Sequence, residues 1–385
     1  MKVAVAHNRY TSGQPSGENL VVDAEIAQLR SAGVDVVPFI RDSDAIGRLP
    51  AVQKALLPLS PVYNPWTARA LAALLREHRP DVLHLHNPYP LLSPWMVRVA
   101  HRHGVPVVQT VHNYRHVCAP GVYFRDGHIC HDCRGRVIPL PAVQHACYRG
   151  SRAQSAVMAA TLAAHRGTWR TVDRYLALTQ VVADHLISYG IPAAHVIVKP
   201  NGVPDPGPPP ADRGSGFLFA ARLSPEKGLG VLLDAWRRHP ERTLGTLTIA
   251  GDGDQRPLAE AAAAQRSDVV YAGRLDPAAM RAAVRGAAVV VVPSLWDEPF
   301  GLVVVEALAN GRPVLGTITG AIPELVGDAG WTVPPTVDGL AAGLLRAGAP
   351  DPARSITARR RYEENFTEEV NVKRLIDVYT SVTRP

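Results

Sequence analysis

This sequence of 385 residues has no long apolar run. Its longest candidate extends from Ala287 to Val292 and stops at Pro293, whereas a helix that crosses a bilayer needs about 18 apolar residues. Aromatic residues are also scarce, at 6%, and no known nucleic-acid-binding module is present, so we expect no nucleic-acid partner. The N-terminus starts directly with an alternating strand pattern and shows no signal-peptide features, which predicts a cytoplasmic protein.

Lysine is rare as well, with 5 residues against 36 arginines, a ratio that a GC-rich genome explains. That bias does not explain how charge is distributed along the chain. Residues 1–200 hold 21 Lys and Arg against 12 Asp and Glu, whereas residues 201–385 hold 20 against 22. The positive field of the first half favours an anionic partner there, such as a phosphate, an acidic saccharide or an anionic membrane surface.

Short apolar runs alternate with helix-length segments throughout the chain, a pattern typical of α/β units with a parallel sheet. The length indicates two domains, and 46% hydrophobic residues can fill two cores. The predicted strands are Lys2–His7, Val34–Phe39, Asp81–His86, Val105–Val111 and Arg174–Leu178 in the first half, and Gly216–Ala221, Thr246–Gly251, Val269–Gly273, Val289–Val292 and Pro313–Gly316 in the second.

A proline-rich run over Pro204–Pro210 separates the two alternating patterns, since neither a helix nor a sheet accommodates it. We therefore predict an N-terminal Rossmann-like domain over 1–200, with a cysteine-rich insertion at about 115–150, and a C-terminal domain over 201–367. A last helix over 368–385 is expected to cross back to the first domain. Two such lobes imply a cleft between them, the usual place for a ligand.

The strongest motif runs from Ser294 to Ala307. A predicted strand ends just before it, Glu298 follows in a turn, and a helix that opens near Gly301 carries Glu306. Unpaired backbone N–H groups at such a helix start can hold a phosphate. Two carboxylates just over two helical turns apart can contact successive parts of one extended ligand. The apolar residues between them argue against a solvent-exposed pair.

This motif resembles the Glu-x7-Glu signature of the retaining glycosyltransferases of glycosyltransferase family 4. Other segments that are similar to the family span nearly the whole chain, namely Asn201–Val203, Phe219–Gly228, Ile249–Gly253 and Tyr271–Leu275. The resemblance implies the GT-B fold, an α/β architecture in which two Rossmann-like parallel-sheet domains face a central cleft.

The resemblance also implies roles for individual residues. Arg222 and Lys227 would contact the donor's diphosphate, Glu298 the hydroxyl groups of the donor sugar, and Glu306 the ribose hydroxyl groups. No catalytic cofactor is expected. The predicted catalytic residues are His112, Arg222, Lys227 and Glu298, and the predicted donor-binding residues are Gly17, Arg222, Lys227, Gly251, Arg274, Leu275, Glu298, Phe300, Gly301, Leu302 and Glu306.

The first domain is expected to supply the facing wall of the site. The loop Thr11–Asn19 lies between a strand and a helix, but it has only two of the three glycines of a dinucleotide-binding fingerprint. His112 ends a predicted strand, and in the family a histidine at this place meets the donor sugar. His84 and His86 alternate on another strand, and we assign them to packing.

Four cysteines fall in one segment, Cys118, Cys130, Cys133 and Cys147, and include a Cys-x2-Cys pair. In a cytoplasmic protein this pattern favours a structural zinc ion that staples an irregular loop. Disulfides are the second interpretation, disfavoured by a reducing compartment, and redox catalysis is the third.

Together these features predict a retaining glycosyltransferase that moves a hexosyl or N-acetylhexosaminyl group from a nucleoside-diphosphate sugar. UDP is favoured over GDP only by its frequency in the family, and the acceptor would be a saccharide, a lipid-linked sugar or a natural product. The alternatives are another nucleotide-dependent two-Rossmann enzyme and a non-catalytic nucleotide-sugar-binding protein. The arginine-bearing helix Ser151–Arg170 is interpreted as a packed helix, with a membrane-surface helix as the alternative and peripheral membrane contact left open.

Overall fold

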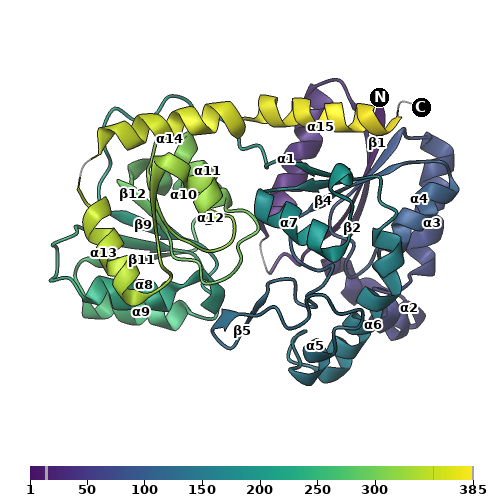
Figure 1. The fold of residues 1–385 in the computed structure, drawn as a ribbon, viewed down its shortest axis with the longest axis horizontal. Coiled ribbons are helices and arrows are strands. Elements are labelled where there is room, and N and C mark those ends of the chain that lie inside the picture. The colour runs from purple at the N-terminus through teal and green to yellow at the C-terminus, as the bar shows by residue number, and fades with distance from the viewer. Residues whose placement is uncertain (14–15, 350, 384–385) are drawn as a thin grey trace. The chain divides into compact units, whose positions relative to one another are not determined.

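The computed structural model describes residues 1–13, 16–349 and 351–383. The chain forms two compact units, which are described separately (Figure 1). Unit 1 consists of Met1–Tyr123, His131–Gly202 and the chain from Asn371 onward. Unit 2 consists of Val203–Val370 together with the short segment Phe124–Cys130.

Unit 1 is built on a parallel sheet of six strands in the order β2-β1-β3-β4-β7-β8. Most of its central strand residues are apolar and buried, because helices cover both faces of the sheet. The strands are β1 (Lys2–Arg9), β2 (Asp35–Asp42), β3 (Val82–Leu85), β4 (Val107–Val111), β7 (Arg174–Ala177) and β8 (Val196–Val198).

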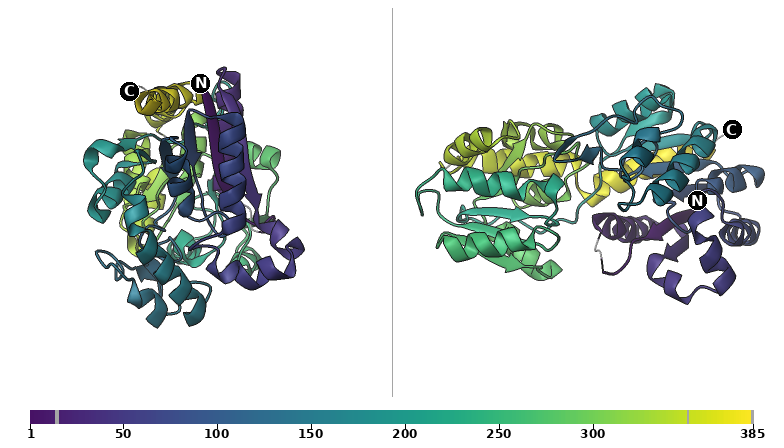
Figure 2. Two further views of the ribbon diagram at one scale, coloured as in Figure 1. Left: turned by 90° about the vertical axis from the view of Figure 1, so that its right-hand side faces the viewer. Right: turned by 90° about the horizontal axis from the view of Figure 1, so that it is seen from below.

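Two sets of helices cover this sheet, and alternation along β1 (Lys2–Arg9) shows which side each set occupies. Val3 and Val5 pack against α1 (Gly17–Ser31) and α15 (Glu368–Thr383). Ala4 and Ala6 face the other core, which holds α3 (Pro65–His78), α4 (Trp95–Arg102) and α7 (Gln180–Tyr189). The last helix, α15, runs beside the first strand, with Tyr379 fully buried in unit 1 (Figure 2).

Between β4 and β7 the chain of unit 1 is irregular. It includes α5 (Leu140–Gln144), followed by the longer α6 (Arg152–Trp169). Met158, Leu162 and Trp169 of α6 are buried, so its apolar face packs inside unit 1, as the simpler interpretation of this helix predicted. The antiparallel hairpin of β5 (Phe124–Arg125) and β6 (His128–Ile129) interrupts this segment. Elsewhere in unit 1, helix α2 (Ala51–Leu56) follows β2.

Unit 2 repeats the architecture with a second six-stranded parallel sheet, in the order β11-β10-β9-β12-β13-β14. Its strands are β9 (Phe217–Ala220), β10 (Leu247–Ala250), β11 (Val269–Gly273), β12 (Val289–Val292), β13 (Val314–Thr317) and β14 (Gly330–Val333). Helices α8 (Leu229–Arg237), α9 (Arg256–Gln265) and α13 (Val337–Ala347) cover one face, around the buried Trp236. Helices α10 (Pro277–Gly286), α11 (Leu302–Ala309), α12 (Ile322–Val326) and α14 (Pro352–Asn365) cover the other (Figure 1).

These two parallel α/β sheets confirm the predicted fold class. All ten predicted strands are present, with ends shifted by at most three residues. The sequence analysis missed the edge strands β8 and β14, which are only three and four residues long, and the hairpin of β5 and β6. No helix among the described residues has the length and apolar character needed to cross a membrane.

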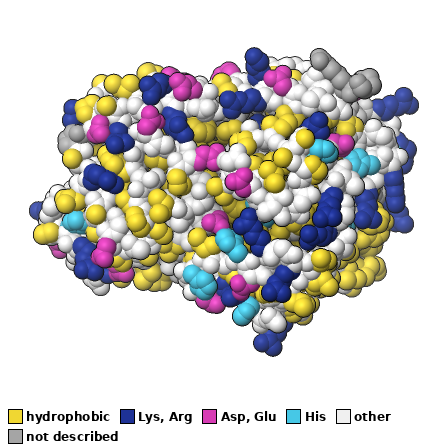
Figure 3. Space-filling model, viewed as in Figure 1, with side chains coloured by type: hydrophobic (Ala, Val, Ile, Leu, Met, Phe, Trp, Pro, Cys, Tyr) yellow, Lys and Arg dark blue, Asp and Glu magenta, His cyan; other side chains and the backbone are white. Residues whose placement is uncertain are grey.

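The basic character of the first half is visible on the surface. On the face drawn in Figure 3, Lys and Arg side chains gather over the part of unit 1 that holds α3, α4 and α6. Arg98 and Arg102 of α4 also lie over the ring of Trp95, at 4.6 and 5.7 Å from its centre.

Candidate active site

The predicted donor-binding residues of unit 2 come from loops at one edge of its sheet. Arg222 and Lys227 follow β9, Gly251 follows β10, Leu275 follows β11 and Glu298 follows β12. Because the strands are parallel and adjacent, their carboxyl ends lie at the same edge, where open α/β sheets place their ligands. The fold thus brings together residues that lie up to 76 positions apart in the sequence.

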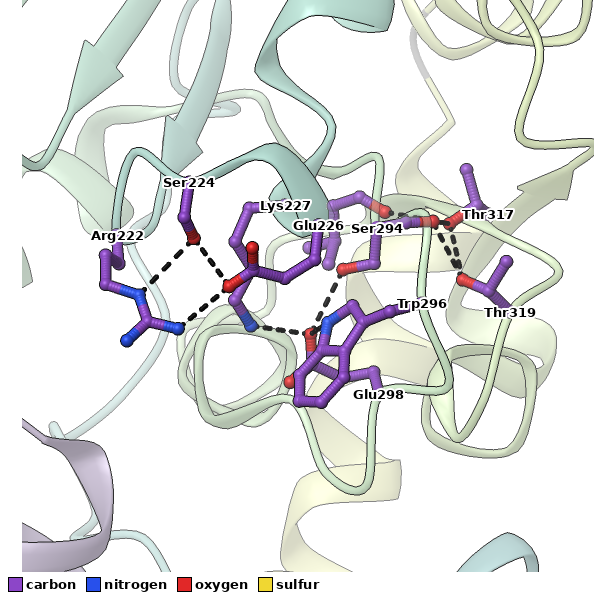
Figure 4. Close-up of polar contacts among 10 residues, drawn as sticks. Arg222, Ser224, Glu226, Lys227, Ser294, Trp296, Glu298, Thr317 and Thr319 are labelled. Atoms are coloured by element: carbon purple, nitrogen blue, oxygen red, sulfur yellow. Dashed lines mark hydrogen bonds and ion pairs between the residues drawn. The ribbon is translucent and has the colours of Figure 1, made fainter. Parts of the chain in front are cut away.

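Glu298 is the centre of the contacts at this edge (Figure 4). Its Oε2 atom accepts hydrogen bonds from Lys227 Nζ at 2.7 Å, Trp296 Nε1 at 2.9 Å and Ser294 Oγ at 3.1 Å. The Lys227 ammonium group also lies 5.0 Å from the centre of the Trp296 ring, within the range of a cation–π contact. These contacts fix a buried carboxylate and a half-buried cation side by side.

The loop that carries Ser294, Trp296 and Glu298 is itself held by hydrogen bonds. Thr317, the last residue of β13, and Thr319 after it both donate to the carbonyl oxygen of Ser294, at 2.6 and 2.8 Å. The backbone N–H of Ala321 donates to the carbonyl oxygen of Glu298 at 2.8 Å. The turn is therefore positioned from its neighbouring strand before any ligand binds.

Arg222 belongs to a second, smaller set of contacts (Figure 4). Its Nη2 atom donates to Glu226 Oε1 at 2.8 Å, and Ser224 Oγ donates to the same oxygen at 2.6 Å. Burial raises the pKa of the Glu226 carboxyl, but the hydrogen bond from Ser224 and the charge of Arg222 outweigh it and lower this pKa. The guanidinium side chain is 60% exposed, so its other N–H groups can reach a ligand.

Two glycines allow the backbones at this edge to approach closely. Gly228 has φ +78°, and a Cβ atom there would lie 1.9 Å from the carbonyl oxygen of Pro293. Gly251 has φ +141°, and its Cβ would lie 1.8 Å from the carbonyl oxygen of Ala221. A larger residue at Gly228 would push apart the loops that carry Lys227 and Glu298, and one at Gly251 would push apart the loops that follow β9 and β10.

Helix α11 opens at Leu302 without a side-chain cap, and Gly301 occupies the cap position. Such a helix start has backbone N–H groups available to an anion. Glu306 lies one turn further along, and burial raises the pKa of its carboxyl, with the charge of Arg281 acting in the opposite direction.

Phe300 is buried, 6.5 Å from the ring of Phe366, so it supports the loop. Arg274 is exposed.

In unit 1, His112 follows β4 and contacts a second histidine. Its Nε2 atom lies 3.0 Å from Nδ1 of His86, and the two rings stack at 5.3 Å between centres. Burial holds the pKa of His112 well below its usual range, and the neighbouring His86 lowers it further. His112 is therefore a neutral imidazole at physiological pH.

His84 of β3 and His86, the residue just after this strand, both meet a buried carboxylate, Glu25 of α1. Glu25 Oε1 lies 3.2 Å from His84 Nδ1 and 3.3 Å from His86 Nε2. Its other oxygen accepts a hydrogen bond from Lys199 Nζ at 3.0 Å. Tyr379 of α15 closes the group, with its hydroxyl 2.6 Å from His84 Nδ1. The two histidines are buried, as predicted, and they also contact the buried ion pair of Glu25 and Lys199.

The predicted glycine loop is described only in part, because its residues 14–15 lie outside the described residues. Gly17 begins α1, and Ser16 caps this helix by accepting from the backbone N–H of Glu18 at 3.2 Å. Tyr10 donates its hydroxyl to Glu18 Oε2 at 3.1 Å. Burial raises the pKa of Glu18 to about 7, although the charge of Arg115 opposes this shift.

The four cysteines do not form a closed metal site. Each is half-buried and none forms a disulfide. Cys118 and Cys133 pack beside the main core of unit 1, and Cys147 joins Cys133 beside a small cluster around Met158. Within the described residues, the only three metal-binding side chains with ligand atoms within 4.8 Å of one another are Glu25, His84 and His86. The zinc site stays a prediction that this geometry does not support.

Comparisons with known proteins identify the family of this chain. The family description "Glycosyl transferase 4-like domain" matches residues 16–202, and "Glycosyl transferases group 1" matches residues 214–348. The chain belongs to the GT4-like glycosyltransferases. The predicted family is thus confirmed, and the match includes both units.

Relatives of this chain carry the names of different enzymes. The phosphatidyl-myo-inositol mannosyltransferase of Mycobacterium leprae is 28% identical over 66% of this chain and 60% of its own length. The glycogen synthase of Mycobacterium tuberculosis is 28% identical over 80% of this chain and 70% of its own. An uncharacterized glycosyltransferase of Methanocaldococcus jannaschii, MJ1607, is 32% identical, but over only 42% of this chain and 44% of its own.

Solved structures show the same fold at low sequence identity. Anabaena Alr3699/HepE in complex with UDP has a TM-score of 0.65 and 18% identity, over 99% of this chain and all of that one. Sucrose-phosphate synthase from Thermosynechococcus elongatus has a TM-score of 0.71 and 20% identity, over 99% and 98%. At these identities the likeness establishes the GT-B fold and no substrate.

The structure also shows contacts of residues that the sequence analysis did not select. Trp296 and Ser294 lie inside the recognised motif, but only the structure shows that both donate to Glu298. Glu25 and Lys199 belong to no sequence motif, and they meet because α1 packs against the sheet of unit 1. The alternation of His84 and His86 was the one sequence signal for this second group.

Proposed function

We propose that this glycosyltransferase is a retaining enzyme that moves a hexosyl or N-acetylhexosaminyl group from a nucleoside-diphosphate sugar to an acceptor hydroxyl group. The observation that carries the proposal is the pairing of Lys227 with Glu298 beside Arg222, at the carboxyl ends of the strands of unit 2. Cations at this edge suit a diphosphate leaving group, and a carboxylate beside them suits the hydroxyl groups of a sugar.

The chemical step needs negative charge to be stabilised where it develops. As the bond between the anomeric carbon and the diphosphate oxygen breaks, Arg222 and Lys227 hold that oxygen's phosphate group. The acceptor oxygen bonds to the same face of the carbon, and its proton passes to the departing phosphate oxygen. Glu298 orients the sugar, and Glu306 accepts hydrogen bonds from the ribose hydroxyl groups. No catalytic cofactor enters this scheme.

For the donor we favour a UDP-sugar, with a GDP-sugar as the alternative. The structural neighbour Alr3699/HepE was solved with UDP-glucose, which supports UDP. Several mycobacterial relatives are named phosphatidyl-myo-inositol mannosyltransferases, which supports a lipid-linked acceptor. Another neighbour, AviGT4, takes part in Avilamycin A biosynthesis, so a natural product is a second acceptor class, besides a saccharide.

We also propose that the protein is cytoplasmic and contacts the inner membrane face peripherally when the acceptor is a lipid. The excess of Lys and Arg in the first 200 residues supports attraction to anionic lipids. Co-sedimentation with vesicles of anionic and of neutral lipid tests this, because binding should require the anionic lipid and weaken with salt.

Donor screening tests the central proposal. A panel of UDP- and GDP-sugars is added to the protein, and thermal stability is measured for each. A donor at 100 times its Kd should add about 2.7 kcal/mol to the free energy of unfolding. Stabilisation by no sugar nucleotide would contradict the proposal, whereas stabilisation without donor turnover would favour a non-catalytic nucleotide-sugar-binding protein.

Product stereochemistry tests the retaining step. The selected donor is incubated with a panel of acceptor alcohols, and NMR coupling constants give the anomeric configuration of the product. We expect the donor's configuration to be kept. An inverted product would show that the same-face mechanism is wrong while leaving the glycosyltransferase activity itself in place.

A further inference from the structure

The buried group of Glu25, His84, His86 and Lys199 in unit 1 has no role in the scheme above, although it contacts His112. Its members are almost fully buried, with exposed fractions of 6% for Glu25, 2% for His86 and 3% for Lys199. Three of its side chains could hold a metal ion by type and distance. The Lys199 ammonium group, 3.0 Å from Glu25, already supplies the compensating positive charge, so the group needs no metal.

Glu25 determines which nitrogen of His86 carries the hydrogen. Burial raises the pKa of the Glu25 carboxyl, but Lys199 and His84 outweigh it and hold this pKa well below its usual range. An ionised carboxylate can only accept hydrogen bonds. Glu25 Oε1 lies 3.3 Å from His86 Nε2 and 3.2 Å from His84 Nδ1. His86 Nε2 is fully buried and makes no hydrogen bond of standard geometry among the described residues, so the Glu25 carboxylate is the charged group beside it. A lone pair on Nε2 would be repelled by this ionised carboxylate, whereas an N–H group is attracted to it. The hydrogen of His86 is therefore on Nε2, facing the carboxylate.

The other nitrogen of His86 then determines the state of His112. Burial lowers the pKa of His86 to about 4, so the ring is neutral and has a single N–H group. Its Nδ1 atom has a lone pair and lies 3.0 Å from Nε2 of His112. Because Nδ1 can only accept, His112 must donate from Nε2. A neutral His112 with its hydrogen on Nε2 has a lone pair on Nδ1.

We propose that Glu25 and His86 are positioning residues that fix His112 as the Nε2–H tautomer and so make its Nδ1 atom the acceptor for a hydroxyl group of a substrate. The step from His112 to the substrate rests on the function proposed above; the tautomer itself rests only on the contacts within unit 1. A carboxylate that sets the tautomer of a functional histidine is an established device in enzymes, and here it acts through a second imidazole. Lys199 keeps the carboxylate ionised and oriented.

Glu25→Gln gives the sharpest test, because Lys199 should orient the new amide. An ammonium group only donates, so the amide oxygen should face Lys199 and the amide NH₂ should face His86. His86 Nε2 must then accept, its hydrogen moves to Nδ1, and Nδ1 donates to His112. The hydrogen of His112 would consequently move from Nε2 to Nδ1. The tautomer of His112 is read from ¹⁵N chemical shifts and long-range ¹H–¹⁵N couplings of the imidazole, without any ligand.

His86→Leu is the second variant, and His84→Leu is its matched control. His84 lies two residues earlier, on β3, is equally buried and also contacts Glu25, but it bonds to Tyr379 and Thr110 and not to His112. Both variants lose a buried polar contact and should lose stability. Only His86→Leu removes the acceptor of the His112 hydrogen, so only this variant should give a mixture of both His112 tautomers.

The kinetic readout separates positioning from general damage. In His86→Leu and Glu25→Gln, kcat should fall about tenfold, the effect of one hydrogen bond of ordinary strength, while the Kd of UDP stays within a factor of two. The control His84→Leu should keep its kcat within a factor of two at a temperature where it is folded.

Two results would overturn the inference: wild-type His112 with its hydrogen on Nδ1, or His112 that stays Nε2–H in both Glu25→Gln and His86→Leu. The tautomer is measured on ligand-free protein, so it is independent of the donor. If no sugar nucleotide is turned over but the tautomers change as described, the positioning role stands and the proposed function fails. If the enzyme turns over a donor but the tautomers stay unchanged in the variants, the positioning role fails and the proposed function stands.

Discussion

Lys227 Nζ lies 2.7 Å from Glu298 Oε2, although the two residues are 71 positions apart in the sequence. The cation that would hold the leaving phosphate is thus already neutralised by the carboxylate that would hold the sugar. A donor that enters this site competes with the ion pair for Lys227. Trp296 and Ser294 keep Glu298 in place during that exchange, because both donate to the same oxygen.

The first prediction concerns this cation. Lys227→Met keeps the length of the side chain and removes its charge, so the growing charge of the diphosphate loses one partner. We expect kcat for donor cleavage to fall about 100- to 1000-fold, the usual effect of removing one group that stabilises charge in the transition state. The measurement is steady-state release of the nucleoside diphosphate.

Arg256→Met is the matched control for Lys227→Met. Arg256 is also in unit 2, but it is exposed on α9 and paired with Glu260. Its replacement should change kcat by less than a factor of two. Lys227→Met with near-normal turnover, and with circular dichroism showing a folded chain, would remove Lys227 from the donor site.

The second prediction uses two nearby glycines of unit 2. Gly228 has φ +78° and would place a Cβ atom 1.9 Å from the carbonyl oxygen of Pro293, so Gly228→Ala must separate the two loops. Gly230 is in the first turn of α8 and has no atom within 4 Å of its Cβ position. Gly228→Ala should lower the free energy of unfolding by more than about 1 kcal/mol. Gly230→Ala should raise it by about 0.5–1 kcal/mol.

Urea denaturation followed by tryptophan fluorescence gives both values. The pair is informative because both variants add the same methyl group two residues apart. Equal effects of the two substitutions would mean that the approach of Gly228 to Pro293 does not hold the loops together. A loss of donor affinity in Gly228→Ala alone would link this approach to the site.

Much of the fold could be predicted from the sequence because burial on both faces gives continuous apolar strands, such as Val289–Val292 of β12. Two of the four edge strands escaped. The three residues of β8 (Val196–Val198) are not fully buried, and β14 (Gly330–Val333) contains a glycine and a threonine, so neither forms a long apolar run. The donor-site residues could be predicted because they belong to short sequence motifs, and one motif, Glu298–Glu306, carries five of the eleven. Their partners in space, such as Lys227 and Glu298, are set by the order of the strands.

The network around Glu25 could not be predicted in the same way. Glu25 belongs to a helix whose other buried residues, such as Val22 and Leu29, are apolar, and an isolated glutamate on such a helix usually faces solvent. Its partner Lys199 lies 174 positions away, and Tyr379, which bonds to His84, lies 295 positions from that histidine. The packing of α1 and α15 on one face of the sheet helps to bring these residues together.

The third prediction concerns Glu18, whose pKa burial raises to about 7. The folded protein holds this proton more tightly than the unfolded chain, so its contribution to stability is fully present at low pH and is lost as pH rises through the folded pKa. Relative to Glu18→Gln, the wild type should therefore lose Tm between about pH 5 and about pH 8. Differential scanning calorimetry of both proteins over this range measures the difference.

Glu77→Gln is the control for Glu18→Gln, because Glu77 is an exposed glutamate of the same unit, with a side chain 75% exposed. The Tm difference between Glu77→Gln and wild type should stay constant over the same pH range. A constant difference for Glu18→Gln as well would show that the Glu18 carboxyl is ionised in the folded protein at neutral pH, and that burial does not control it.

The last prediction keeps zinc as a proposal on the strength of the cysteine spacing alone. Cys130 and Cys133 form a Cys-x2-Cys pair, Cys118 and Cys147 flank it, and no cysteine is in a disulfide. We propose that the four thiolates bind one structural zinc ion, which requires their sulfur atoms to come closer together than the present arrangement. A four-thiolate site is closed, so the metal would stabilise the loop and take no part in catalysis.

Elemental analysis of protein purified without added metal should give one zinc per chain. Cys130→Ser and Cys133→Ser should each release the metal and lower Tm, because the binding energy of a structural zinc appears as folding energy. Cys147→Ser should have the same effect if all four thiolates are ligands. Metal-free protein in which all four thiols are readily alkylated under native conditions would contradict the zinc site, and the segment would then be stabilised by its apolar cluster around Met158 alone.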